Sequence, residues 1–310
     1  MKSIPDIGPL VYGTLPMGPL QAGLSPEEGG RLIAHALISG VTTVDTAEMY
    51  GTYVHIRRAT ELSGHRPVVI TKTHAATAGE ARDHLEKALR ELGVERLDVA
   101  NVHGARLENP FDERSEVFAE ILKMIDEGKV GALGLSTHRF KVVEMACGYP
   151  EISFIHPLIN KLGLGIIDGG ASQMAAAIER VAQKGKVVYA MKALAGGNLI
   201  SEAYSCLEYV RTLPGVASLA VGMLSEAEVD ANVAYFLHNK SDPQVWEALS
   251  KRQRRLVVMK QFCVGCGTCV ETCSSMALTL VEGKVSVDAS SCVLCGYCAP
   301  SCPAFLLRIV

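Results

Sequence analysis

The chain has 310 residues, of which 48% are hydrophobic and 20% are charged, and its formal net charge is −3. This balance gives no reason to expect a general affinity for nucleic acid or for an anionic membrane. No apolar run approaches the roughly 20 residues that span a bilayer, and the first residues lack the apolar core of a signal peptide. We therefore expect a cytoplasmic protein, with one barrel of about 250 residues and a small appendage.

Short apolar runs alternate with amphipathic stretches over the first 240 or so residues. The runs that predict strands begin at Leu10, Val41, Val68, Leu97, Gly131, Ser153, Val187 and Ser218. Helical spacing predicts helices at about 25–40, 79–92, 115–127, 172–183, 202–212 and 225–236. Eight buried parallel strands covered by helices indicate an α/β fold, a (β/α)8 TIM barrel. The alternative is an open doubly wound sheet, but no Gly-x-Gly-x-x-Gly follows the first strand.

Ionisable residues stand where the second, third and fourth predicted strands end. Asp45 and Lys72 end two of these strands, and His103 follows the next. Neighbouring barrel strands lie about 5 Å apart, so their side chains and Tyr50, in the loop after Asp45, can converge over the barrel axis. An ammonium close to a phenol lowers the pKa of the phenol, while a carboxylate keeps the ammonium charged. His103 can donate to a carbonyl oxygen that gains negative charge, so the group suits carbonyl reduction or alcohol oxidation.

Four ordered motifs carry a resemblance to a known family. They are Asp45-Thr46-Ala47-x-x-Tyr50-Gly51, Lys72-Thr73-His74, Val102-His103-Gly104 and Gly131-x-x-Gly134-Leu135-Ser136. Together they resemble the successive signatures of the aldo/keto reductase superfamily, over roughly residues 8–236. The resemblance implies an oxidoreductase that acts on a small molecule. It also implies a catalytic tetrad with Tyr50 as the general acid, formed by Asp45, Tyr50, Lys72 and His103.

The nicotinamide site that the resemblance implies departs from the family pattern. Its positions correspond here to Ser136, Thr137, His156, Asn160, Met191, Lys192 and Gly222. Thr137 replaces an Asn, His156 a Gln, and Met191 the aromatic ring that stacks on the nicotinamide. Glu228 stands where Arg is frequent, and a carboxylate would repel a 2′-phosphate. The expected cofactor is therefore NAD(P)H, with NADPH disfavoured, or a flavin. Lys192 is either a ligand for a phosphate or carboxylate, or an ordinary surface lysine.

A linker helix is expected between the barrel and a cysteine-rich end. Asp242-Pro243 predicts a helix start, and apolar residues recur to about Leu256. Two short runs joined at 282–284 predict a hairpin within the cysteine-rich end. The expected boundaries are 1–238 for the barrel, 239–258 for the linker helix, and 259–310 for a small α+β domain.

Eight of the ten cysteines form two runs of Cys-x-x-Cys-x-x-Cys-x-x-x-Cys. In a reducing compartment this clustering favours metal ligation over disulfides. The duplicated run resembles the signature of bacterial two-cluster ferredoxins, in which the fourth cysteine of each run ligates the other cluster. Zinc sites usually lack the third cysteine. The resemblance implies a ferredoxin-like iron–sulfur domain with two [4Fe-4S] clusters, one held by Cys263, Cys266, Cys269 and Cys302, the other by Cys273, Cys292, Cys295 and Cys298.

The two resemblances together leave several functions open. A nicotinamide moves two electrons at once and a cubane one at a time, so coupling them needs a converter such as a flavin. The first hypothesis is an iron–sulfur oxidoreductase of the aldo/keto reductase type. The alternatives are a ferredoxin-fed, flavin-dependent reductase on the same barrel, and an electron-transfer subunit with a non-catalytic barrel; the clusters could also be purely structural. The expected partners are a small-molecule substrate and a ferredoxin or other redox protein, without nucleic acid or membrane.

Overall fold

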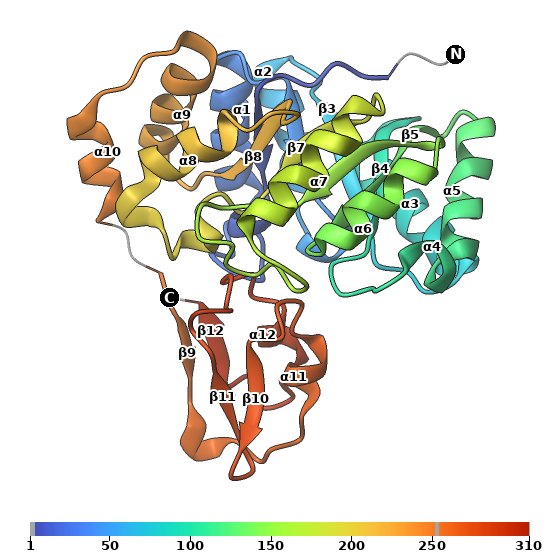
Figure 1. The fold of residues 1–310 in the computed structure, drawn as a ribbon. Coiled ribbons are helices and arrows are strands. Elements are labelled where there is room, and N and C mark those ends of the chain that lie inside the picture. Colours follow the sequence, from blue (N-terminus) through green and yellow to red (C-terminus); the bar gives the residue numbers. More distant parts are fainter. Residues whose placement is uncertain (1–3, 252–253, 310) are drawn as a thin grey trace.

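The computed structural model describes residues 4–251 and 254–309, which form a barrel with a smaller lobe beside it (Figure 1). Eight parallel strands make the closed barrel, because the first strand pairs with both the second and the eighth. The strands are β1 (Leu10–Gly13), β2 (Thr43–Asp45), β3 (Val68–Thr73), β4 (Leu97–His103), β5 (Val130–Thr137), β6 (Ile152–Pro157), β7 (Val187–Ala190) and β8 (Ser218–Gly222). The predicted (β/α)8 barrel is therefore confirmed.

Helices cover the outside of the barrel, and local signals explain where they begin and end. α1 (Pro26–Ile38) begins with a capping box, in which Ser25 and Glu28 each accept the other's backbone N–H. α3 (Ala78–Leu92) begins in the same way and ends at Gly93, whose φ of 69° is left-handed. The other helices of the barrel are α2 (Tyr53–Ser63), α4 (Pro110–Glu113), α5 (Ser115–Asp126), α6 (Phe140–Met145), α7 (Ala171–Gln183), α8 (Ala203–Arg211) and α9 (Glu226–His238).

One barrel helix lacks a strong signal in the sequence. α2 follows the second strand, where we expected only connecting sequence, and its apolar face is narrow. Tyr53, Ile56 and Ala59 are buried at a spacing of three, while most of the remaining side chains are polar. Packing against α1, rather than local propensity, therefore accounts for this helix.

The barrel interior is a packed core beneath a polar layer. Its floor consists of buried side chains from several strands, which include Val11, Ile70, Val99, Phe154 and Tyr189. Each large apolar side chain buried in this way contributes on the order of 1.5–3 kcal/mol. Polar residues at the carboxyl ends of the strands therefore stand on a rigid support.

The smaller lobe is built from two antiparallel strand pairs and short helices (Figure 1). The predicted hairpin is confirmed, with Val281 opposite Lys284 at its tip. α10 lies in the connection from the barrel. The elements are α10 (Pro243–Ser250), β9 (Leu256–Val258), α11 (Thr268–Thr272), β10 (Leu278–Val281), β11 (Lys284–Val287), α12 (Cys298–Ser301) and β12 (Leu307–Ile309). Short 3-10 helices occur at Leu15–Met17, Glu48–Tyr50, Ala146–Gly148, Ala195–Gly197, Ile200–Glu202 and Lys260–Phe262.

The linker helix is shorter than the sequence predicted. It ends at Ser250, and Leu256 begins β9, which pairs with β12. The expectation of a helix that reaches about Leu256 is therefore wrong. The apolar residues 256–258 satisfy their backbone in a ladder with a strand about fifty residues later, which helical periodicity could not reveal. No helix among residues 4–251 and 254–309 is long and apolar enough to cross a membrane.

Candidate active site

A buried ion pair lies at the carboxyl ends of β2 and β3. Lys72 Nζ is 2.6 Å from both carboxylate oxygens of Asp45 and donates to the Thr46 carbonyl at 2.9 Å. Lys72 is only 1% exposed and Asp45 only 5%. Burial raises the pKa of Asp45 and lowers the pKa of Lys72, while their mutual attraction opposes both changes. Each group therefore depends on the other, because an unpaired charge here would be strongly destabilising.

Tyr50 lies above this pair, in the 3-10 turn that follows β2. Lys72 Nζ is 5.1 Å from the centre of the Tyr50 ring. The pKa of Tyr50 is raised well above its usual value, first by burial and then by Tyr297 and Asp45. The expectation that Lys72 lowers this pKa is wrong for the structure, because Asp45 compensates the ammonium and the phenol is desolvated. Tyr50 therefore keeps its proton, which suits a proton donor.

His103 completes the predicted tetrad from the end of β4. Its pKa is lowered to about 3, first by burial and then by the charge of Lys72. The imidazole is therefore neutral near pH 7 and can donate one hydrogen bond to a ligand. The structure thus brings together Asp45, Tyr50, Lys72 and His103 at one rim of the barrel, as the sequence predicted.

A second set of residues that holds Asp45 was not predicted. The Tyr189 hydroxyl donates to Asp45 Oδ2 at 3.3 Å, and Asn101 donates to the same hydroxyl. His156 stacks on the Tyr189 ring with 3.9 Å between ring centres, and its Nδ1 lies 2.6 Å from the Tyr189 carbonyl oxygen. The sequence does carry one signal for this contact, because Tyr189 brings a hydroxyl into the otherwise apolar strand 187–190.

A cavity of about 330 Å³ opens beside Asp45 and Tyr50. Four of the predicted cofactor positions line it: His156, Met191, Lys192 and Gly222. The other predicted positions lie outside its lining. The Asn160 side-chain amide donates to the Leu164 carbonyl at 2.9 Å and accepts the Leu164 N–H at 3.0 Å. The Thr137 hydroxyl oxygen accepts the N–H of Arg139. The buried hydroxyl of Ser136, opposite His103 in the ladder, has no partner within the described part of the chain.

Two cations face the cavity from different parts of the chain. Lys192 follows β7 with a φ of 63°, a conformation that side chains rarely adopt. Arg254 comes from the segment after α10. Burial lowers the pKa of both groups, and neither side chain has an ion pair or hydrogen bond with another residue that the structure describes. Two such cations beside mostly apolar walls fit a ligand that carries phosphate or carboxylate.

The predicted cluster ligands gather in two groups of four. The outer cysteines, Cys263, Cys266, Cys269 and Cys302, line one small cavity, and the inner cysteines, Cys273, Cys292, Cys295 and Cys298, line another. No disulfide links any of the ten cysteines. Backbone N–H groups point at three of the sulfurs, which are Cys273 (3.2 Å), Cys263 (3.5 Å) and Cys302 (3.5 Å). Four thiols around each cavity and N–H donors to sulfur fit a cubane in each group.

The inner cysteines lie against the barrel mouth. Gln21 donates to the carbonyls of Leu294 and Cys295 at 3.1 and 3.2 Å, and Asn198 donates to the Cys292 carbonyl at 2.6 Å. Tyr297, from the same loop, lies between Tyr50 and His103. In the cysteine pattern Tyr297 occupies a spacer position, so the sequence gives no signal for this contact.

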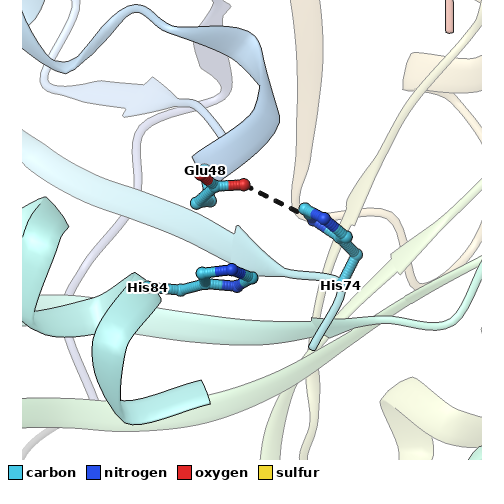
Figure 2. A group of neighbouring side chains, drawn as sticks. All are labelled: Glu48, His74 and His84. Carbon is cyan, nitrogen blue, oxygen red and sulfur yellow. Dashed lines mark ion pairs between the residues drawn. The ribbon is translucent and has the colours of Figure 1, made fainter. Parts of the chain in front are cut away.

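A second group of ionisable residues consists of Glu48, in the turn that carries Tyr50, with His74 and His84 (Figure 2). Glu48 faces His74 at 3.6 Å and Lys87 at 3.0 Å, and His84 lies beside His74 with 5.1 Å between ring centres. The ligand atoms of the two histidines and Glu48 lie within 4.8 Å of one another. The Lys87 ammonium already compensates the carboxylate, so this group supports the turn that carries Tyr50.

Comparisons with known proteins agree with both parts of the chain. Residues 9–205 match the aldo/keto reductase family, and residues 262–305 match the 4Fe-4S dicluster domain. An aldo-keto reductase of Mycobacterium ulcerans is 28% identical over 171 residues, or 51% of this chain and 60% of that protein. The 6-dehydroglucose reductase of Agrobacterium fabrum is 25% identical over 156 residues, or 43% of this chain and 51% of that protein. The chain thus spans little more than half of these relatives.

Solved structures show the same barrel. An aldo-keto reductase from Bacillus halodurans in its holo form superposes with a TM-score of 0.60 at 18% identity, over 78% of this chain and 91% of that one. The glycerol dehydrogenase of Gluconobacter oxydans gives 0.58 at 18% identity, over 81% and 92%. At this identity the likeness concerns the fold alone. With the family match over more than half of its length, the chain belongs to the aldo/keto reductase family and carries a C-terminal 4Fe-4S dicluster domain.

Proposed function

We propose that this iron–sulfur oxidoreductase reduces the carbonyl group of a small molecule, or oxidises the corresponding alcohol, at the rim formed by the tetrad. The observation that carries the proposal is the buried Asp45–Lys72 pair beneath a protonated Tyr50, with a neutral His103 beside it. Tyr50 would give its proton to the substrate oxygen as negative charge develops there. His103 would donate a second hydrogen bond to the same oxygen.

The cavity beside Tyr50 would hold the redox cofactor. Lys192 and Arg254 would bind its phosphates, and the walls near Leu207 and Trp246 would exclude water from its rings. A nicotinamide would supply hydride, and a flavin would exchange either one or two electrons. Glu228 faces the same cavity, and its carboxylate would disfavour a cofactor with an additional phosphate at that end.

The second candidate is the ferredoxin-fed, flavin-dependent reductase, and the place of the inner cysteines favours it. Lys192 lines the cavity and is within electrostatic range of Cys292 and Cys295. An inner cluster would therefore stand next to whatever the cavity binds, and it could deliver electrons singly. A flavin would convert these single transfers into the two-electron reduction of a carbonyl.

The test is a cofactor analysis of the anaerobically purified protein, followed by turnover assays. We expect the absorbance of iron–sulfur clusters and either flavin bands or NADH-dependent reduction of an aromatic aldehyde. NADH oxidation without a flavin would support the nicotinamide form, and activity only with reduced methyl viologen and a bound flavin would support the second. A protein with full clusters that reduces no carbonyl with either donor would contradict both and favour an electron-transfer subunit.

A further inference from the structure

Tyr297 belongs to the iron–sulfur domain but lies inside the barrel's site. It stands between two inner cysteines, Cys295 and Cys298, and is only 7% exposed. Its hydroxyl donates to the Tyr50 hydroxyl at 3.3 Å and lies 3.4 Å from His103 Nε2. The Tyr297 ring centre is 6.5 Å from that of Tyr50 and 5.9 Å from that of His103.

The Tyr297 ring packs among apolar side chains, and its hydroxyl faces the polar groups of Tyr50 and His103. The side chain packs with Leu15, Leu20 and Ala47, all of them buried residues of the barrel mouth. This apolar slot and the neighbouring cavity share Leu15 and Tyr50 as walls, while Tyr297 and His103 do not line the cavity. The tetrad therefore adjoins the cavity through Asp45 and Tyr50, and it contacts Tyr297 of the iron–sulfur domain through Tyr50 and His103.

The Tyr297 hydroxyl occupies the position where a reacting substrate oxygen would have to bind, next to Tyr50 and His103. Proton donation requires the oxygen within about 2.6–3.2 Å of the Tyr50 hydroxyl, and stabilisation of its charge requires a hydrogen bond from His103. One oxygen atom, that of Tyr297, already contacts both groups, and two oxygens cannot share the position. Both contacts are long for O–H···O and N–H···O geometry, so they are weak enough to be exchanged.

We propose that Tyr297 holds the substrate-oxygen position from the iron–sulfur domain, and that the substrate must displace its phenol from Tyr50 and His103 to react. The inference rests on the proposed function for the identity of that oxygen. It makes Tyr297 a residue that governs which ligands enter the site: a ligand must bring an oxygen acceptor and a body that fits the apolar slot. Because Tyr297 follows Cys295 by two residues, the exchange also disturbs the loop that holds an inner cysteine.

The experiment uses 4-nitrophenol as the probe and the full-length protein with its clusters. Tyr297→Ala removes a phenol from the slot, and the probe carries a phenol whose ionised form has its own absorbance. We expect Tyr297→Ala to bind the probe at least tenfold more tightly than the wild type. A second substitution, Tyr50→Phe, should return the affinity to the wild-type level. Tyr204→Ala removes a half-exposed tyrosine ring from the barrel surface and should leave probe binding as in the wild type.

Two results would overturn the proposal. One is equal affinity in the wild type and in Tyr297→Ala, which would mean that the position is already open. The other is tight binding that persists with Tyr50→Phe, which would place the probe in the neighbouring cavity. If Tyr297→Ala loses iron, Tyr297→Leu is used with trifluoroacetate and fluorine NMR, because leucine keeps the apolar packing and frees the hydroxyl end. At least tenfold tighter binding than in the wild type is expected there, and unchanged binding would equally contradict the proposal.

These binding measurements need no turnover, so the proposed reaction and the proposed role of Tyr297 can fail separately. Probe binding that follows the expectation in a protein without carbonyl reductase activity would leave the place of Tyr297 standing and remove the proposed reaction. Carbonyl reduction with no change of probe binding would do the reverse.

Discussion

The inner and outer cysteines belong to one small domain, yet their surroundings differ. The inner group faces the barrel, where Gln21 and Asn198 hold its loop. The outer group lies toward the tip of the β10–β11 hairpin, where Lys284 donates to the Cys263 carbonyl. Exposed apolar side chains surround the outer group: Phe262 (63%), Val264 (81%) and Phe305 (67%). The domain therefore has two different ends, one that contacts the barrel and one that carries exposed apolar side chains.

The largest effect on carbonyl reduction is expected from a substitution in the barrel. Tyr50→Phe removes the proton donor, and general acid catalysis contributes about 10²–10⁴-fold to a rate. We expect a loss of kcat in that range for reduction of an aromatic aldehyde, with both clusters retained by iron analysis. Tyr204→Phe is the matched control and should keep the wild-type rate. A loss of less than tenfold for Tyr50→Phe would show that the barrel does not use this phenol.

Ligand substitutions compare the two groups of cysteines directly. Cys298→Ser is expected to remove the inner cluster and Cys266→Ser the outer one, and either change should lower the iron content from about eight to about four atoms per chain. Because only the inner group adjoins the cavity, Cys298→Ser should abolish turnover driven by a one-electron donor. Cys266→Ser should keep turnover with a small viologen and lose it with a protein donor. Equal losses in both variants with the viologen would contradict the division into two ends.

Acid should act on the barrel through its buried histidines. The pKa of His103 is lowered to about 3, first by burial and then by Lys72, and burial is also the main cause that lowers the pKa of His138 and His156. Histidine in an unfolded chain has a pKa near 6.5, so between about pH 6.5 and pH 3 the unfolded chain binds protons that the folded barrel does not. This stability is fully present above about pH 6.5 and is lost as the pH falls toward 3.

Urea unfolding, followed by the fluorescence of the single tryptophan, Trp246, measures this effect. The midpoint should be lower at pH 5.0 than at pH 7.5, and His138→Phe should reduce the difference by removing one of the buried histidines. A midpoint that does not change between the two pH values would contradict the assignment of these histidines as neutral.

The smallest effect is expected at the outer end. Phe305→Glu places a charge beside the outer cysteines, in an apolar surface that would contact a ferredoxin-like donor. We expect the second-order rate with such a donor to fall about three- to tenfold, and the rate with a small viologen to remain unchanged. Leu162→Glu alters a similarly exposed residue on the barrel (61%) and is the control. An equal effect of both substitutions would remove the outer end as the docking site.

The sequence predicted the barrel and its rim because both follow from local patterns. The eight apolar runs are short and separated by amphipathic helices, and Asp45, Lys72 and His103 stand where strands end. The features that the sequence predicted wrongly or not at all depend on residues that are distant along the chain. The desolvation that raises the pKa of Tyr50 comes from packing, and β9 is defined by a strand near the chain's end. The contact between Tyr50 and Tyr297 joins residues 247 positions apart.

The interface between the two lobes contains two glycines at positions where no side chain would fit. A Cβ at Gly196 would collide with the Val293 carbonyl, and one at Gly296 would collide with the Leu20 carbonyl. Both glycines have a positive φ, of 74° and 83°, so any other residue would be strained as well as crowded. A change of either codon to alanine or serine would therefore leave the reading frame, the cysteines and the tetrad intact while it wedged the lobes apart. Random mutagenesis that selects for loss of electron delivery with full iron content should recover these two positions.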